Sequence, residues 1–232
     1  FDDVGQDDPL APLLIPLGGL SLSVAMATGI NTRAGCRHIL EYAFEHAIAT
    51  GRKKVTIVHK ANIMKALTGI FKETAEQMYE EKYKGRIAME SVIVDACAMK
   101  LVLNPWQFDV LVTTNLFGDI LSDLGPACTG TIGLAPSANL NPERKFPSLF
   151  EPVHGSAPDI YGQNIANPVA MIWSGALMLD FLGQGNAAFR QAHDAIVQAI
   201  EVALITGPRT PDLGGNASTQ EMGAAIAARV AG

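Results

Sequence analysis

Two aspartates at helical spacing are the residues of this sequence that most directly predict chemistry. Asp119 and Asp123 belong to the run NLFGDILSD at residues 115–123, so a helix there would place both carboxylates on one face. A divalent cation such as Mg²⁺ or Mn²⁺ would offset the repulsion between them, because these ions prefer carboxylate oxygens. Alternatively, both side chains lie in the first turn of the helix, where the helix dipole stabilises negative charge. The spacing alone leaves both interpretations open.

A lysine and a third aspartate extend this candidate site. Lys60 follows the strand-like run Val55–Val58, and Asn62 comes two positions later. An amine beside a cation releases its proton more easily, which suits proton transfer, although a solvated lysine in a turn is the simpler interpretation. Asp95 interrupts an otherwise apolar stretch, so its carboxylate needs a partner, which is either a cation or an arginine.

A loop rich in glycine and proline carries a second group of candidate residues. Residues 151–160 read EPVHGSAPDI. His154 could stack on or hydrogen-bond with a nucleotide base. Asp159 could accept hydrogen bonds from ribose hydroxyls, and it would repel a 2′-phosphate. Because histidine and aspartate are common in loops, this pattern alone does not distinguish a nucleotide site from an ordinary loop.

Helices that alternate with strands must position these residues. Apolar periodicity predicts strands over 55–58 and 109–112, and helices over 33–49, 63–83, 91–103, 118–124, 168–182, 187–205 and from Ser218 onward. Residues 125–166 are predicted to be a loop, and residues 1–30 a loop with one short strand. This alternation indicates an α/β fold. The two aspartates follow strand 109–112, at the end where open α/β sheets place their sites.

Composition excludes several other classes of protein. The 232-residue chain has a net charge of −6, which does not favour nucleic acid as a partner. Its three cysteines are far apart, which argues against a disulfide framework and a thiolate zinc site. Prolines and glycines interrupt the most apolar stretch, Leu10–Ile30, so we do not expect a membrane span. The acidic first residues do not resemble a secretory signal. We therefore expect a cytoplasmic protein.

Taken together, these runs resemble the isocitrate/isopropylmalate dehydrogenase family of metal-dependent decarboxylating dehydrogenases. Residues 115–123 resemble its NLxGDxxSD motif, HGSAPD at 154–159 its adenosine-binding loop, and IANP at 165–168 the segment after that loop. The resemblance extends over about residues 32–232. It implies a two-domain, isopropylmalate dehydrogenase-like α/β architecture with a parallel or mixed sheet, here without the usual N-terminal portion.

The resemblance also implies a division of the chain and a role for each candidate residue. Residues 1–31 would be a poorly matched segment, 32–124 the central dimerisation domain and 125–232 half of the cofactor-binding domain. Mg²⁺ or Mn²⁺ would be held by Asp95, Asp119 and Asp123, with Lys60 in proton transfer and Asn62 near the substrate or nicotinamide. The adenosine half of the cofactor would be surrounded by His154, Gly155, Ala157, Asp159, Ile160 and Asn167.

Cofactor choice and assembly follow from the same resemblance. Asp159 and Ile160 resemble the NAD type, because NADP forms usually have a basic residue and a tyrosine there. In this family the counterparts of Lys60 and Asp95 serve the site of the neighbouring subunit, so catalysis by this pair implies a homodimer.

The activity implied is NAD- and Mg²⁺- or Mn²⁺-dependent oxidative decarboxylation of a small 2-hydroxy acid. Residues 125–180 resemble family members that act on tartrate or D-malate, whereas residues 56–109 resemble those that act on isocitrate or homoisocitrate; 3-isopropylmalate is also possible. We favour a substrate of the D-malate or tartrate type.

The family normally has further chain before the matched part, with an arginine cluster for the substrate carboxylates, and no arginine occurs in residues 1–31. We therefore expect little turnover from this chain alone. The alternative is a truncated, non-catalytic structural or regulatory subunit.

Overall fold

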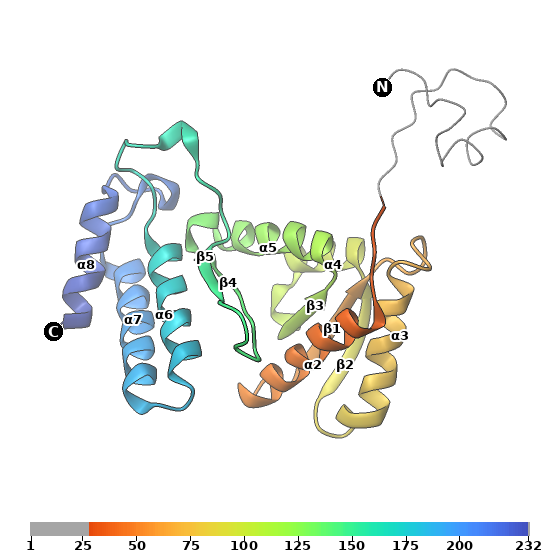
Figure 1. Cartoon of the computed structure of the whole chain (residues 1–232). Helices are drawn as coiled ribbons and strands as arrows, with labels where there is room; N and C mark the ends of the chain where they lie inside the picture. Colours follow the sequence, from red (N-terminus) through yellow and green to blue (C-terminus); the bar gives the residue numbers. More distant parts are fainter. Residues whose placement is uncertain (1–27, 232) are drawn as a thin grey trace, which may run out of the picture. The chain divides into compact units, whose positions relative to one another are not determined.

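Three parallel strands organise the first half of the chain in the computed structural model, which describes residues 28–231. They are β1 (Lys54–His59), β2 (Ala88–Ile93) and β3 (Val110–Thr113), in the order β2-β1-β3 (Figure 1). Val58 of β1 aligns with Val92 of β2 on one side and with Thr113 of β3 on the other. All three strands therefore end at the same edge of the sheet.

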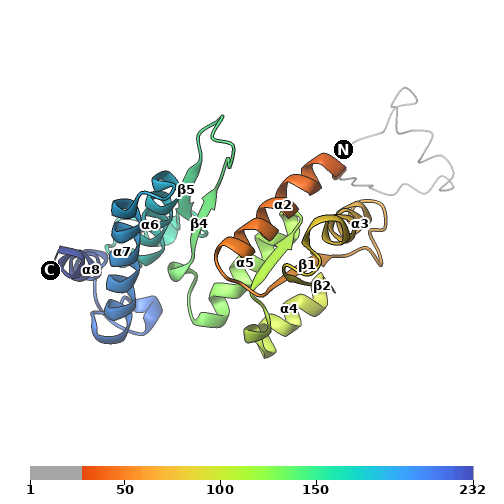
Figure 2. The same cartoon turned by 90° about the horizontal axis from the view of Figure 1, so that it is seen from below.

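Helices cover both faces of this sheet (Figure 2). On one face lie α2 (Arg33–Ala49) and α3 (Gly69–Met78), which a π-helical turn (Tyr79–Tyr83) extends. On the other lie α4 (Val94–Leu103) and α5 (Asn115–Thr129).

Each face of the sheet has its own hydrophobic core. Phe44 and Phe71 pack against Val55 and Ile57 on the α2 and α3 side, and Cys97, Leu101 and Leu121 pack against Val58 on the other side. Because both faces are covered, β1 is buried from Val55 to His59.

A β-hairpin and three helices form the second half of the chain. The hairpin consists of β4 (Pro136–Asn139) and β5 (Leu149–Pro152), and both strands contact α6 (Val169–Gly183). Two further helices follow, α7 (Ala187–Thr206) and α8 (Thr219–Ala231). Their shared core contains Val169, Ala199, Ile200, Ala203, Met222 and Ile226. Short 3₁₀ helices lie at Pro105–Gln107, Ile132–Leu134, Pro158–Ile160 and Pro211–Leu213.

The predicted α/β class and the helix over 33–49 are confirmed. The predicted helix over 63–83 is wrong at its start, because α3 begins only at Gly69. Before it, the backbone N–H groups of Ile63 and Met64 both donate to the Lys60 carbonyl, which forms a turn. The expectation for residues 1–30 lies almost wholly outside the described residues.

The predicted helix over 91–103 is also wrong at its start, because residues up to Ile93 belong to β2. Periodicity did not indicate a strand here because Glu90 and Ser91 are polar. The structure supplies their partners from β1: Thr56 Oγ1 donates to Glu90 Oε1 at 2.7 Å, and His59 Nε2 lies 2.8 Å from Ser91 Oγ.

The segment predicted as a loop over 125–166 contains regular structure. The helix predicted over 118–124 runs from Asn115 to Thr129, with Pro126 inside its last turn. The hairpin of β4 and β5 follows; it pairs two short strands across a nine-residue connection at residues 140–148, which local periodicity does not reveal. Helix α5 also spans the predicted domain boundary between residues 124 and 125, and that division of the chain stays a prediction.

The start of α6 differs slightly from the prediction. The helix begins at Val169, so Pro168 precedes its first turn. Asn167 still acts as expected for a helix start, because its Oδ1 accepts from the backbone N–H of Val169 at 3.0 Å. No described helix is both long enough and apolar enough to span a membrane.

The start of α8 provides a first testable prediction. Glu221 Oε2 accepts from the backbone N–H of Ser218 at 2.8 Å, and Ser218 Oγ accepts from the backbone N–H of Glu221 at 3.2 Å, which is a capping box. Ser218→Ala is expected to cost about 1 kcal/mol and to lower the melting temperature by about 2–4 °C. Ser156 is exposed and forms no side-chain hydrogen bond with a described residue, so Ser156→Ala provides the control. Equal melting temperatures for the two variants would contradict the prediction.

Candidate active site

Lys60 and Asp95 form an ion pair at the carboxyl edge of the parallel sheet. Lys60 directly follows β1, Asp95 lies in the first turn of α4 after β2, and Lys60 Nζ donates to Asp95 Oδ1. The side chain of Lys60 is 25% exposed and that of Asp95 is 59% exposed. The hydrogen bond from Lys60, aided by a backbone N–H, holds the pKa of Asp95 below its usual value. The partner that Asp95 needs is therefore a lysine within the same chain.

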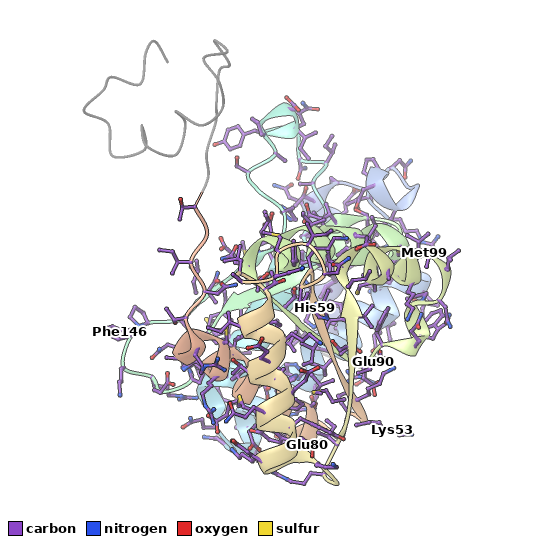
Figure 3. All side chains as sticks on the ribbon, turned by 90° about the vertical axis from the view of Figure 1, so that its right-hand side faces the viewer. Lys53, His59, Glu80, Glu90, Met99 and Phe146 are labelled. Atoms are coloured by element: carbon purple, nitrogen blue, oxygen red, sulfur yellow. The ribbon has the colours of Figure 1, made fainter. Side chains whose placement is uncertain are left out.

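The backbone around Lys60 is fixed by buried polar groups. The Lys60 N–H donates to Thr68 Oγ1 at 3.1 Å, and the Ala61 N–H donates to His59 Nδ1 at 3.0 Å. Since Nδ1 of the neutral ring then accepts, Nε2 carries the proton and donates to Ser91 Oγ. Burial, together with the positive charge of Lys72, lowers the pKa of His59, so the ring stays neutral near pH 7. Figure 3 shows His59 at the end of its strand.

Asp119 and Asp123 lie in the second and third turns of α5, one helical turn apart, as the spacing predicted. The alternative that both lie in the first turn of the helix is wrong, because the first turn of α5 contains no acidic residue. Both aspartates are exposed, and neither carboxylate forms a hydrogen bond or ion pair with a described residue. Two unpaired carboxylates one helical turn apart repel each other, and a hard divalent cation would bind both. The chemistry of this donor pair therefore fits Mg²⁺ or Mn²⁺.

The described part of one chain does not bring all three predicted metal ligands together. Within residues 28–231, no three acidic, histidine or cysteine side chains are placed to hold a metal ion. Asp95 is instead paired with Lys60. Asp95 also lies on α4, whereas Asp119 and Asp123 lie on α5. One chain thus presents two separate half-sites, the pair on α5 and the pair at Lys60.

The predicted cofactor loop borders two adjoining hollows of about 430 and 380 Å³. His154, Gly155, Ala157 and Ile160 line both hollows, and Asn167 lines the second. Among the described residues, no lysine or arginine lines either of them. These volumes lie within the range of small-molecule sites, and a lining without a basic side chain suits a nucleoside better than a phosphate.

Two of the predicted cofactor residues do not line these hollows. Asp159 is exposed on the short helix Pro158–Ile160, and its backbone carbonyl accepts from Gln163 Nε2 at 2.7 Å. Asn62 is exposed in the turn after Lys60. Ala157, which does line them, has a left-handed backbone (φ 47°), which turns the chain into the short helix.

Asp212 belongs to the wall of the second hollow, and sequence reasoning missed it. Its Oδ2 accepts from Thr131 Oγ1 at 2.8 Å and from Asn167 Nδ2 at 3.0 Å, while its Oδ1 accepts from Thr210 Oγ1 at 2.5 Å. Partial burial alone would raise the pKa of this carboxyl, but the hydrogen bonds outweigh burial and lower it. The sequence TPDLGG around it indicates only a turn, because two of the three donors are distant in sequence.

The lowered pKa of Asp212 predicts a pH-dependent contribution to stability. A carboxyl whose folded pKa lies below its unfolded value, near 3.8, stabilises the fold at pH values above 3.8. That contribution is lost as the pH falls through the lower folded pKa. Because Asp212 is exposed and solvent weakens its hydrogen bonds, we expect Asp212→Asn to cost only about 0.5–1 kcal/mol at pH 7, and the difference from wild type to shrink below pH 4. Urea unfolding at pH 7 and pH 3 measures it, and a difference independent of pH would contradict it.

These elements and residues place the chain in a known class of enzymes. A profile of the isocitrate/isopropylmalate dehydrogenases matches residues 17–226, and the chain belongs to this family. The solved structure of isocitrate dehydrogenase from Methylococcus capsulatus superimposes with a TM-score of 0.80 at 45% identity, covering 90% of this chain and 59% of that one.

Two curated relatives show where in the family the similarity is strong. The chain is 53% identical over 208 residues to a decarboxylating D-malate dehydrogenase from Escherichia coli (strain K12), covering 90% of this chain and 57% of that protein. It is 52% identical over 216 residues to a tartrate dehydrogenase/decarboxylase from Pseudomonas putida, covering 90% of this chain and 59% of that one. The chain therefore spans less than two thirds of the length of these relatives.

Proposed function

We propose that this chain provides the catalytic and cofactor-binding half of an NAD-dependent dehydrogenase that uses Mg²⁺ or Mn²⁺ to decarboxylate a small 2-hydroxy acid. The observation that carries the proposal is the Lys60–Asp95 pair at the carboxyl edge of the sheet, in a chain that also presents an unpaired acidic pair on α5. A substrate of the D-malate or tartrate type is favoured, because the relatives named for those acids are more than half identical to this chain.

Each half-site has a defined role in this proposal. Asp119 and Asp123 hold the cation, and Asp95 of a second protomer completes the site. When bound, the cation would polarise the substrate's hydroxyl oxygen and stabilise the negative charge that develops as CO₂ leaves. Lys60 moves a proton to or from the substrate through water, and Asp95 orients its ammonium group. Since His154, Gly155, Ala157 and Ile160 line both hollows, we assign the hollows to the adenosine half of NAD.

A homodimer is needed for this arrangement, because the two half-sites are separate within one chain. Exposed apolar side chains on α4 and in the turn after it support such an interface: Met99, Val102, Leu103 and Trp106 are 56%, 60%, 73% and 90% exposed. Leu116 and Ile120 of α5, beside the acidic pair, are 63% and 54% exposed. Helices α4 and α5 contact each other, and large exposed apolar side chains on neighbouring helices are typical of a protein interface. Figure 3 shows Met99 on the outer side of α4.

Measuring the binding of NADH and of Mn²⁺ tests the proposal. We expect NADH and Mn²⁺ each to bind to the 232-residue protein, measured by fluorescence and calorimetric titration. We expect little or no NADH formation from D-malate by the 232-residue chain, because no arginine occurs in residues 1–31 and arginine is the side chain best suited to binding the carboxylates of a diacid. Rapid turnover of D-malate would contradict this expectation. A chain that binds neither NADH nor Mn²⁺ would instead support a non-catalytic structural or regulatory subunit. A cytoplasmic location is part of the same proposal.

A further inference from the structure

We propose that Asp212 is a positioning residue for the cofactor pocket, because its carboxylate ties together three chain segments that form one wall of that pocket. The inference rests on the proposed function, since it takes the second hollow as the seat of the adenosine half of NAD. Asp212 itself need not touch the cofactor. Its role is to fix groups that do.

Side chains from three segments of the chain donate hydrogen bonds to this one carboxylate. Thr131 donates from the segment between α5 and the hairpin, Asn167 from the residues before α6, and Thr210 from the turn after α7. All three donors reach the two oxygens of one side chain. Thr131, Asn167 and Asp212 also line the second hollow, so the network forms part of its surface.

The network is packed as well as hydrogen-bonded. Thr131 Oγ1 also accepts from the backbone N–H of Gly133 at 3.0 Å. A Cβ atom at Gly133 would lie 2.8 Å from both Asn167 Cβ and Asp212 Oδ2, so only glycine fits here without a shift. Thr210 is fully buried, and Asn167 is 9% exposed. The carboxylate thus fixes side chains that have little room to move.

The network also clarifies the predicted role of Asn167. Its Oδ1 is engaged by the backbone N–H of Val169, and its Nδ2 donates to Asp212. The side-chain amide is therefore held in one orientation, with one N–H left for a ligand. Asp212 decides which way that amide faces, and this is how it would act on the cofactor.

An exchange of the two polar groups tests the proposal. In Asp212→Asn, an amide nitrogen can face the donors of Thr131 and Asn167, and NADH should bind about tenfold more weakly to the chain. Asn167→Asp places two carboxylates side by side and should weaken binding similarly. The double variant Asp212→Asn/Asn167→Asp swaps amide and carboxylate and restores the hydrogen bond between positions 167 and 212, so backbone exchange in the three segments should return toward the wild-type rate. NADH affinity should stay low in this variant, because a carboxylate at position 167 has no N–H to offer a ligand. Tyr83→Phe, which removes the bond to Glu45 at 3.0 Å in the α2 and α3 core, is the control.

A second measurement separates this inference from the proposed function. Hydrogen exchange of backbone amides should accelerate in Asp212→Asn at residues 131–135, 165–169 and 210–215, but not in β1. Thr131→Val, which removes one donor, should show the same pattern more weakly if Asp212→Asn does not fold. Unchanged exchange in these segments, or wild-type NADH affinity in Asp212→Asn, would overturn the inference. If the wild-type chain fails to bind NADH, the assignment of the pocket is wrong, and the exchange rates alone decide whether Asp212 organises its wall.

Discussion

Leu103→Asp is expected to leave the chain monomeric at concentrations where the wild-type chain is a dimer. Leu103 lies at the end of α4, where the apolar surface that includes Val102 and Trp106 is exposed. A charge buried at the centre of an interface costs at least 2 kcal/mol, so the dimer dissociation constant should rise by roughly 30-fold or more. Sedimentation velocity measures the effect.

The control for this substitution lies on another element. Ile205 on α7 is 75% exposed, which is close to the value for Leu103, so Ile205→Asp tests an added charge away from α4. The fold of both variants should be unchanged, because each side chain is already exposed. A Leu103→Asp chain that still dimerises would place the interface elsewhere, and it would remove the support for shared sites.

Asp119→Asn is expected to weaken Mn²⁺ binding by at least about 100-fold. The substitution keeps the shape of the side chain but removes one of the two carboxylate charges on α5. Loss of a residue that only hydrogen-bonds to a metal ligand already lowers metal affinity about 10–100-fold, and Asp119 is itself a proposed ligand. Asp194→Asn, on α7 and paired with Arg190, is the control and should bind Mn²⁺ like wild type. Titration calorimetry or Mn²⁺ electron paramagnetic resonance measures the affinity.

Mixing two variants tests whether the metal site is shared between protomers. Asp95→Asn and Asp119→Asn chains should each bind Mn²⁺ poorly. In a two-fold dimer that contains one of each, one site regains Asp95 from one protomer and Asp119 from the other. An equal mixture should then recover about a quarter of the wild-type sites, because half of the dimers are mixed and each has one intact site. No recovery in a mixture that forms dimers would contradict the shared site.

Local patterns were enough to predict much of the fold. Helix α2 and the strands β1 and β3 follow from apolar periodicity, because their buried residues lie on one helix face or in short apolar runs. Strand β2 was missed because Glu90 and Ser91 are acceptable there only through partners on β1. Those partners are more than 30 residues away in the sequence, where no local pattern can show them.

The candidate site also has one part that local sequence predicts and another that depends on contacts between distant residues. The acidic pair on α5 could be predicted because helical spacing alone places Asp119 and Asp123 together. The contact between Lys60 and Asp95 could not, because it depends on the parallel pairing of β1 with the missed strand β2. The role of Asp212 could not be predicted from local sequence either, because its partners Thr131 and Asn167 precede it by 81 and 45 residues.

The central position of β1 has a consequence for biosynthesis. Both of its neighbours come later in the chain, so the apolar segment 54–59 leaves the ribosome before any strand that can pair with it. At roughly 5–20 residues per second, several seconds pass before β3 has been translated. During this delay the nascent segment is a natural binding site for chaperones. Slower translation between β1 and β3 should therefore lower the yield of soluble protein more than slower translation after Thr129.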